Sequence, residues 1–205
     1  VTTDLNGYAH KVKQDIVNPD LLFVGTVFGL FISIDGGKSW TQYSANVPNA
    51  EIRDIAIQPE SNDLILATHG RGLMIIDDLT AIRNISQELL GSDAAFLPTR
   101  QNYTYGGFLG GTFPNQAGTY VGENSTEDAV IMYYLKDRVV TGDVKVEIYD
   151  QSGVMLKSIP GTKRKGINRI TWDMRLKPPK VAKGVRPDQS GFASPFVQEG
   201  VYPIK

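Results

Sequence analysis

An internal repeat constrains the fold of this chain more than any other feature. Asp20-Leu21-Leu22 aligns with Asp63-Leu64-Ile65, and Gly29-Leu30-Phe31-Ile32 aligns with Gly72-Leu73-Met74-Ile75, both at a spacing of 43 residues. Each copy consists of short runs of branched and aromatic residues bounded by Gly, Asn or Pro, a pattern that predicts strands and tight turns. Repeats of about 40–45 residues with four short strands each are typical of β-propeller blades. The spacing therefore predicts an all-β protein with blade-like sheets.

The two copies differ in how many strands they predict. The first covers four apolar runs, at 8–14, 21–26, 29–34 and 39–44, whereas the second covers three, at 52–57, 64–68 and 72–77. The second copy ends at Asp77-Asp78, without a fourth strand. This suits the last blade of a ring, in which the N-terminal part of the longer chain supplies the outer strand. Two blades cannot close a ring. We therefore expect the remaining blades upstream of Val1, and apolar faces on residues 1–78 that need a neighbour.

The octet from Ser33 to Trp40 reads SIDGGKSW. It resembles the Asp-box of the bacterial neuraminidase repeat, S-x-D-x-G-x-[ST]-W. The resemblance implies a structural turn: Ser33 and Asp35 hydrogen-bond the backbone, Gly37 supplies a backbone angle that other residues resist, and Trp40 packs underneath. Such a turn stabilises a blade and performs no chemistry.

The second half of the chain has a different pattern. A capping residue and apolar spacing predict a short helix over 80–90, residues 96–100 form a packed connector, and the Gly-rich stretch 106–122 is an irregular linker. Apolar runs at 130–135, 144–148, 154–159 and 168–173 then predict strands, with Trp172 as a core anchor and a further strand beginning at residues 200–202. Short antiparallel strands at this spacing suggest an incomplete immunoglobulin-like β-sandwich.

We therefore divide the chain into three segments. Residues 1–79 are the final β-propeller blades, residues 80–127 are a linker with a short helix, and residues 128–205 are the incomplete sandwich. The first residues look internal and the last look cut inside a strand, so we expect truncation at both ends.

Together the segments resemble the C-terminal part of secreted bacterial sortilin-like repeat proteins, often labelled glycosyl-hydrolase-like. The matching residues are 22–26, the octet, 67–72 with Asp77-Asp78, 170–173 and 200–202. In that family a sortilin-like propeller precedes a domain similar to the immunoglobulin-like sandwich of the flagellar hook-capping protein. The resemblance implies a secreted, periplasmic or cell-surface location, and it bears on fold more than on activity.

Composition excludes several kinds of site. The chain has no cysteine, which excludes disulfides, thiolate metal sites and cysteine nucleophiles. No apolar run approaches the ~18 residues of a membrane span. We find no metal-binding or phosphate-loop motif, so no metal and no cofactor are predicted. Residues 151–205 hold 11 of the 21 Lys and Arg residues but 3 of the 22 Asp and Glu residues. This basic tail indicates either a polyanionic partner or a solvated loop, and its lysines lack the interleaved aromatics of a nucleic-acid surface.

His69 and Arg71 are the best candidates for binding. In a propeller the turn between the second and third strands of a blade lies on the usual ligand face, which would place Phe28 there as their counterpart on the preceding blade. An arginine there suits a carboxylate or a sugar acid. The alternative is that His69 and Arg71 tie adjacent blades together by pairing with Asp77 or Asp78.

Catalytic residues cannot be assigned from the sequence. A glycosidase needs two carboxylates at a defined separation. Asp54, Asp77 and Asp78 are available, but nothing singles out a pair. The leading hypothesis is a non-catalytic binding or scaffold module that takes a glycan or protein ligand. The alternative is part of a secreted sialidase- or glycosidase-like hydrolase with His69 and Arg71 on its ligand face.

Overall fold

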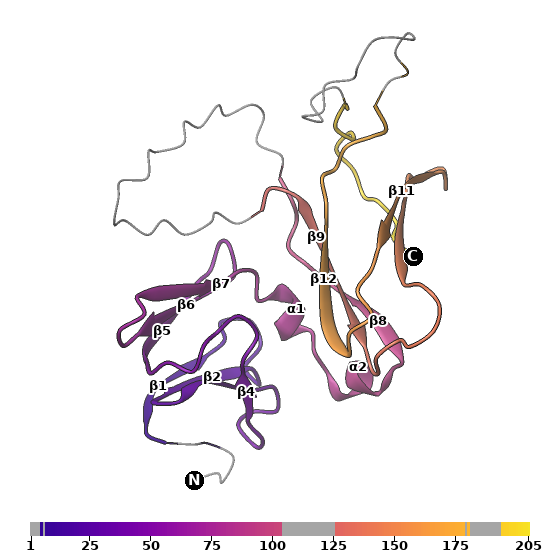
Figure 1. Cartoon of the computed structure of the whole chain (residues 1–205). Coiled ribbons are helices and arrows are strands. Elements are labelled where there is room, and N and C mark those ends of the chain that lie inside the picture. The colour runs from indigo at the N-terminus through magenta and orange to yellow at the C-terminus, as the bar shows by residue number, and fades with distance from the viewer. Residues whose placement is uncertain (1–4, 6, 104–125, 179, 181–193) are drawn as a thin grey trace. The chain divides into compact units, whose positions relative to one another are not determined.

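The computed structural model describes residues 5, 7–103, 126–178, 180 and 194–205. The chain forms two compact units, one of residues 1–92 with 97–100 and the other of residues 93–96 with 101–205. Every sheet in the described ranges is antiparallel and none closes on itself, so the all-β prediction is confirmed (Figure 1). The predicted linker core at 106–122 and most of the lysine-rich stretch after 178 lie outside the described residues.

The first repeat forms a four-stranded sheet. Its strands are β1 (Ala9–Gln14), β2 (Leu22–Thr26), β3 (Gly29–Ser33) and β4 (Thr41–Tyr43), paired in chain order. Each strand is three to six residues long and pairs antiparallel with the strand that follows it in the chain, so the sheet is a meander. The first four predicted strands are therefore confirmed, each within two residues at either end.

The second repeat forms a three-stranded sheet. Its strands are β5 (Ile52–Gln58), β6 (Asp63–Thr68) and β7 (Leu73–Ile76), again in chain order. Residues two apart on a strand share a face, so Leu64, Leu66, Met74 and Ile76 lie on one side and Ile65 and Ile75 on the other.

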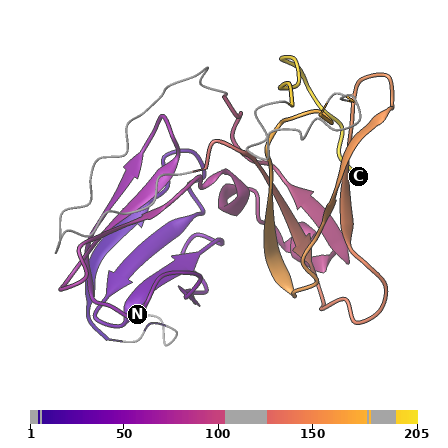
Figure 2. The same cartoon turned by 45° about the horizontal axis from the view of Figure 1, so that its top comes forward.

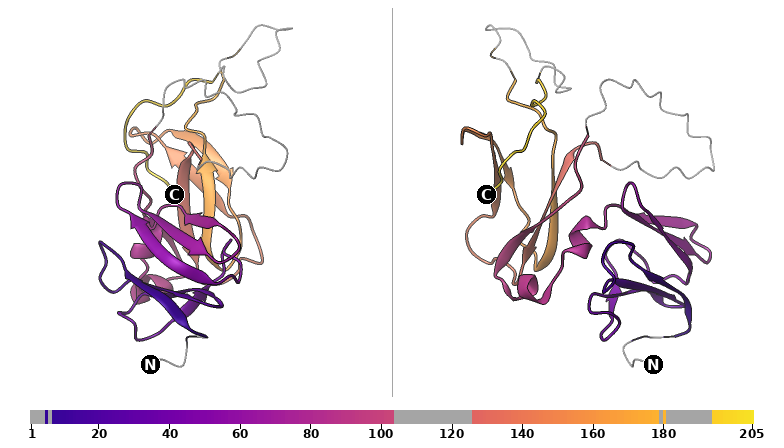
Figure 3. Two further views of the ribbon diagram at one scale, coloured as in Figure 1. Left: turned by 90° about the vertical axis from the view of Figure 1, so that its left-hand side faces the viewer. Right: turned by 180° about the vertical axis from the view of Figure 1, so that it is seen from behind.

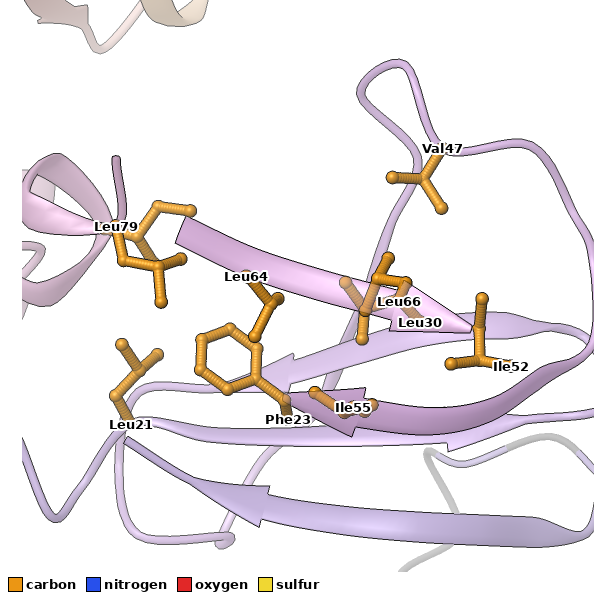
Figure 4. Close-up of a cluster of buried hydrophobic side chains, with 10 residues drawn as sticks. Leu21, Phe23, Leu30, Val47, Ile52, Ile55, Leu64, Leu66 and Leu79 are labelled. Carbon is orange, nitrogen blue, oxygen red and sulfur yellow. The ribbon is translucent and has the colours of Figure 1, made fainter. Parts of the chain in front are cut away.

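The core of the first unit lies between these two sheets, which stack on one another in Figures 2 and 3. Figure 4 shows side chains from both sheets pointing toward each other, with Phe23 between the strands above and below it. β5 contacts both β1 and β2. The buried cluster consists of Leu21, Phe23, Leu30, Val47, Ile52, Ile55, Leu64, Leu66, Leu79 and Ile82.

One face of the β5-β6-β7 sheet is left open. Leu73 is 71% exposed and Ile75 is 60% exposed. In the register Ile75 pairs with Ile65, and Leu73 with Ala67, so these apolar residues share the face turned away from the core. Within the described residues, this face therefore exposes a small apolar patch.

The segment after β7 differs in detail from the prediction. Instead of one helix over 80–90, the chain forms α1 (Thr80–Arg83) and α2 (Gln87–Gly91). Ser86 interrupts the helix because its extended backbone and its hydroxyl, which accepts the N–H of Leu89 at 3.1 Å, start a new N-terminus. Ile82 of α1 helps to close the core.

The second unit contains two further sheets. β8 (Ala94–Leu97), β9 (Ala129–Leu135) and β12 (Gly166–Trp172) pair in the order β12-β9-β8, and β10 (Lys145–Tyr149) pairs with β11 (Met155–Pro160). The strand β8 falls inside the predicted linker, 80–127, for which the sequence predicted a packed connector at 96–100 and no strand. The hydrophobic core of this unit draws on both sheets and on Met174, which follows β12. Its buried residues are Ala129, Ile131, Tyr133, Leu135, Val146, Ile148, Ile170, Trp172 and Met174.

The last residues of the chain extend the β10-β11 sheet. The N–H of Glu147 donates to the carbonyl of Lys205 at 2.9 Å, and the N–H of Lys205 donates back at 3.0 Å. Tyr149 makes a third such bond to Pro203 at 2.9 Å. The predicted strand near residues 200–202 is thus seen slightly later, as a bridge between Ile148 and Ile204. Trp172 is 5% exposed, as expected of a core anchor.

Candidate ligand-binding surface

Two turns of the first unit share one construction. The hydroxyl of Thr26 donates to the carbonyl of Gly29 at 3.2 Å, and the hydroxyl of Thr68 donates to the carbonyl of Gly72 at 2.7 Å. Both glycines have positive φ values, 127° and 68°, which other residues adopt only with strain. The repeat therefore sets up equivalent turns after β2 and after β6, each closed by a threonine that satisfies a backbone carbonyl.

The two turns lie at the same end of their sheets. Gly25, next to the first turn, sits so close to Ile52 that a Cβ at position 25 would come within 2.7 Å of the Cγ2 atom of Ile52. Ile52 in turn pairs with Thr68, which begins the second turn. The absence of a side chain at Gly25 allows this approach, so the tips of both turns face the same side of the unit.

The side chains at the tips are accessible, as a binding surface requires. Phe28 is 54% exposed, and His69 and Arg71 are exposed as well. The N–H of His69 donates to the carbonyl of Glu51 at 2.8 Å, which fixes its backbone. Within the described residues, neither the imidazole of His69 nor the guanidinium of Arg71 makes a hydrogen bond or an ion pair.

The proposed blade-tying pairs are therefore not formed in the described part of the chain. The carboxylate of Asp78 accepts the N–H groups of Thr80 at 3.1 Å and of Arg100 at 2.8 Å. Arg71 has no ion pair with Asp77 or Asp78 there. The guanidinium of Arg71 is left available to solvent or to a ligand.

A polar group beside these turns was missed by the sequence analysis. The Nε2 atom of His10 lies 2.7 Å from the Oε1 atom of Glu51, and the Nη2 atom of Arg53 lies 3.0 Å from the same oxygen. Both histidines of the chain thus lie against Glu51, His10 through its ring and His69 through its backbone. The repeat held a signal, because the spacing of 43 residues makes His10 and Arg53 equivalent positions on β1 and β5.

Asp54, one of the predicted available carboxylates, has a partner. Its Oδ1 atom lies 3.0 Å from the Nζ atom of Lys11. The hydrogen bond from Lys11, followed by the backbone N–H of Ile55, lowers the pKa of Asp54 below its usual value. A glycosidase general acid requires a raised pKa instead. Asp54 is therefore unsuited to that role in this unit.

The Ser33–Trp40 turn lies at the other end of β3 from the Thr26–Gly29 turn. The Oδ1 atom of Asp35 accepts the N–H groups of Lys38 and Ser39, both at 3.0 Å, and the hydroxyl of Ser33 at 2.7 Å. The hydroxyl of Ser39, with these other donors, lowers the pKa of Asp35 far below its usual value. Gly37 completes the turn at φ 89° and donates its N–H to the Ser33 hydroxyl at 2.8 Å.

Trp40 closes this turn from one side. Its indole N–H donates to the carbonyl of Gly37 at 3.1 Å, and the side chain is half-buried. The side-chain polar groups of Ser33, Asp35, Ser39 and Trp40 are thereby directed to one another or to the backbone. The arrangement has a structural role and presents no reactive group to solvent.

Metal sites and membrane-spanning helices were both sought in the described residues. Among them, no group of three or more His, Asp or Glu side chains is placed to hold a metal ion. In the same ranges, no helix has the length and apolar character needed to cross a membrane.

Comparison of the chain with models of known protein families, with curated proteins and with solved structures finds no match.

Proposed function

We propose that this chain is a non-catalytic binding or scaffold segment of a bacterial β-propeller protein of the sortilin-like, Asp-box type. In this proposal residues 1–79 are the final two blades, residues 80–127 connect them to an immunoglobulin-like sandwich, and residues 128–205 are that sandwich, incomplete. The protein is secreted, periplasmic or bound to the cell surface.

One observation carries the proposal: two repeated sheets stack face to face and present equivalent turns on one side. The Thr26 and Thr68 turns have the same hydrogen bond, and Gly25 permits the close approach of β2 to β5. Stacked sheets of this kind are how propeller blades bury their apolar faces. Placing the ligand on loops held by a rigid repeat is common among binding proteins.

The first partner in this proposal is the rest of the propeller, whose blades would cover the exposed apolar face of the β5-β6-β7 sheet. Leu73 and Ile75 lie exposed on it beside Ile65 and Ala67. A contiguous apolar face of this kind marks an interaction surface. Burial stabilises by about 25 cal/mol for each Å² of apolar surface removed from water, so a covering blade would add several kcal/mol.

The second partner is a glycan or protein ligand bound at Phe28, His69 and Arg71. The guanidinium of Arg71, which has no partner among the described residues, offers a planar pair of donors to a carboxylate, and the exposed ring of Phe28 offers a stacking surface. The structural Ser33–Trp40 turn lies at the opposite end of β3 and takes no part.

Binding to a panel of acidic and neutral glycans tests this assignment. The protein for this assay is the longer polypeptide of our proposal, in which further blades precede this chain. We expect Arg71→Ala to weaken binding of an acidic glycan about tenfold or more, as expected for losing a charge-assisted hydrogen bond. Lys38→Ala, which removes an exposed cation from the Ser33–Trp40 turn, is the matched control and should leave binding unchanged. Glycan turnover that Arg71→Ala abolishes would contradict a non-catalytic role.

The second candidate is a secreted glycoside hydrolase in which this segment forms one wall of the cleft. Its specific support is Glu51, a carboxylate at the same edge as His69. Here Arg71→Ala and Glu51→Gln should each reduce turnover strongly while the melting temperature stays the same. A lower melting temperature with full turnover would instead assign both residues to stability.

A further inference from the structure

The second unit carries a cationic pocket that no part of the proposed function uses. It has a volume of about 530 Å³ and is lined by Arg138, Thr162, Lys163, Arg164 and Lys165. Pockets of about 300–1,000 Å³ hold small organic ligands. This volume exceeds the space that a single sulfate or phosphate ion fills, and it suits a ligand of the size of one or two sugar rings.

Lys163, Arg164 and Lys165 lie on one loop, whose backbone is hydrogen-bonded by the side chain of Asn168. This side chain is 4% exposed, although it lies on β12 among apolar neighbours. Its Nδ2 atom donates to the carbonyls of Arg164 at 2.8 Å and Gly166 at 2.9 Å, and its Oδ1 atom accepts the hydroxyl of Thr162. A buried amide is costly unless it is hydrogen-bonded, so these bonds fix the loop conformation.

Further contacts hold the same loop in place. The hydroxyl of Tyr133 donates to the carbonyl of Thr162 at 2.7 Å. A Cβ at Gly161 would come within 2.7 Å of that hydroxyl oxygen, so this position has no room for a side chain. The N–H of Val139 donates to the carbonyl of Lys163 at 3.1 Å and joins the loop to the segment that carries Arg138. The cations are therefore presented by a preorganised frame.

The positive charge of the pocket is only weakly compensated. Lys163 and Lys165 lie 3.4 Å from Asp143 and Asp137, and both aspartates are largely exposed. Exposed pairs of this kind contribute roughly 0–1 kcal/mol, so an incoming anion can replace them. Within the described residues, the guanidinium groups of Arg138 and Arg164 form no ion pair. Two arginines are thus available in a pocket that two lysines also line.

We propose that this pocket binds a sulfated saccharide. Arginine presents a planar fork of donors that matches an oxyanion, and the four cations supply the charge to neutralise more than one such group. Binding of single-stranded nucleic acid relies on aromatic side chains that stack the bases. None of the five lining residues is aromatic, so the pocket favours an anionic sugar over a nucleic acid.

Isothermal titration of the chain tests the proposal. The probes are a sulfated heparin-type hexasaccharide, the same hexasaccharide without sulfate, and inorganic sulfate. We expect the sulfated hexasaccharide to bind more tightly than either of the others, and its affinity to fall as salt screens the open pocket. In the double variant Arg138→Ala/Arg164→Ala the affinity should fall at least about tenfold, because two charge-assisted contacts are lost.

The matched control is Arg169→Ala. Arg169 is an exposed arginine on β12 outside the pocket lining, so the variant should change the affinity by less than about twofold. Near-ultraviolet circular dichroism checks the fold of each variant, and Arg164→Gln offers a milder substitution. Equal losses in the double variant and the control would overturn the proposal. So would binding of inorganic sulfate or the unsulfated sugar as tight as that of the sulfated one, or no binding at all.

Discussion

The ion pair between Arg83 and Asp15 gives the sharpest test of the first unit. The side chain of Asp15 is fully buried and that of Arg83 is 7% exposed. The Nε and Nη2 atoms of Arg83 reach the carboxylate at 2.8–3.0 Å, and its Nη1 atom donates to Asn62. The N–H groups of Val17 and Asn18 donate to the same carboxylate at 3.0 and 2.8 Å. The cluster links the turns after β1 and β5 to helix α1.

Arg83→Ala leaves the carboxylate of Asp15 buried with two backbone donors and no cation. Breaking a buried pair by removing one partner costs about 3–5 kcal/mol, because the remaining charge is uncompensated. The substitution also frees the side chain of Asn62. We therefore expect the free energy of unfolding of this unit to fall by about 3–5 kcal/mol, a large share of the ~5–15 kcal/mol typical of a domain.

Urea unfolding followed by tryptophan fluorescence measures this loss. The chain has two tryptophans, Trp40 in the first unit and Trp172 in the second. In a Trp172→Phe background the signal reports the first unit alone, and the transition midpoint with its slope gives the free energy. Lys11→Ala is the control, because the Lys11–Asp54 pair is exposed and its loss should cost under about 1 kcal/mol. A loss in Arg83→Ala no larger than in Lys11→Ala would refute the reasoning.

The pH dependence of stability gives a second measurement on the same pair. Desolvation by burial raises the pKa of Asp15, but the hydrogen bonds from Arg83, Asn18 and Val17 outweigh it and lower the pKa below its ordinary value of 3.8. A lowered folded-state pKa stabilises the native state above the ordinary pKa, and this stabilisation is lost as the pH falls below it. In Arg83→Ala the desolvation remains without its main counterweight, so the loss between about pH 4 and pH 2 should shrink or reverse.

Three further substitutions test other parts of the fold. Replacing a fully buried aromatic residue by alanine costs about 3–5 kcal/mol, and Trp40 is only half-buried. Trp40→Ala should therefore lower the free energy of unfolding by about 1–3 kcal/mol, measured by thermal unfolding. An unchanged melting temperature would contradict the role of Trp40 in closing the turn. Among the described residues, the buried indole N–H of Trp172 has no hydrogen-bond partner. Trp172→Phe should therefore cost at least about 1 kcal/mol less than Trp172→Ala by thermal unfolding, and equal losses would contradict this. Ile75→Lys should leave the melting temperature of this chain unchanged and raise its solubility, and destabilisation would mean that Ile75 is covered.

Local patterns in the sequence predicted most of the strands because their signals are short-range. Alternation of apolar residues and the turn residues between them placed β1 to β7 and β9 to β12. The strand β8 was missed because Ala94–Leu97 has no alternation, and it becomes a strand only by pairing with β9. The break at Ser86 was missed because apolar spacing continues across it, while the cap depends on a single hydroxyl.

The candidate site was only partly visible for a related reason. The turn residues Phe28, His69 and Arg71 follow from the repeat, since their place in each copy fixes their place in the turn. The repeat relates His10 to Arg53, but the contact of both side chains with Glu51 depends on how β1 packs against β5, which no local pattern specifies. The pair of Arg83 with Asp15 spans 68 positions and depends on how both turns and α1 come together. Long-range polar contacts are thus the part of the site that could not be predicted from the sequence.

The two copies of the repeat share the residues that close their turns and differ in the side chains at the turn tips. Thr26 and Thr68 close equivalent turns with the same hydrogen bond, so the two copies share a frame. The tips of those turns differ: one presents Phe28, and the longer one presents His69 and Arg71. Positions that support the frame are constrained by backbone geometry, whereas the tip side chains make no contact that the frame requires within the described residues. A surface of this kind can change its ligand without changing the fold, which places the specificity of the proposed binding site in the turn tips.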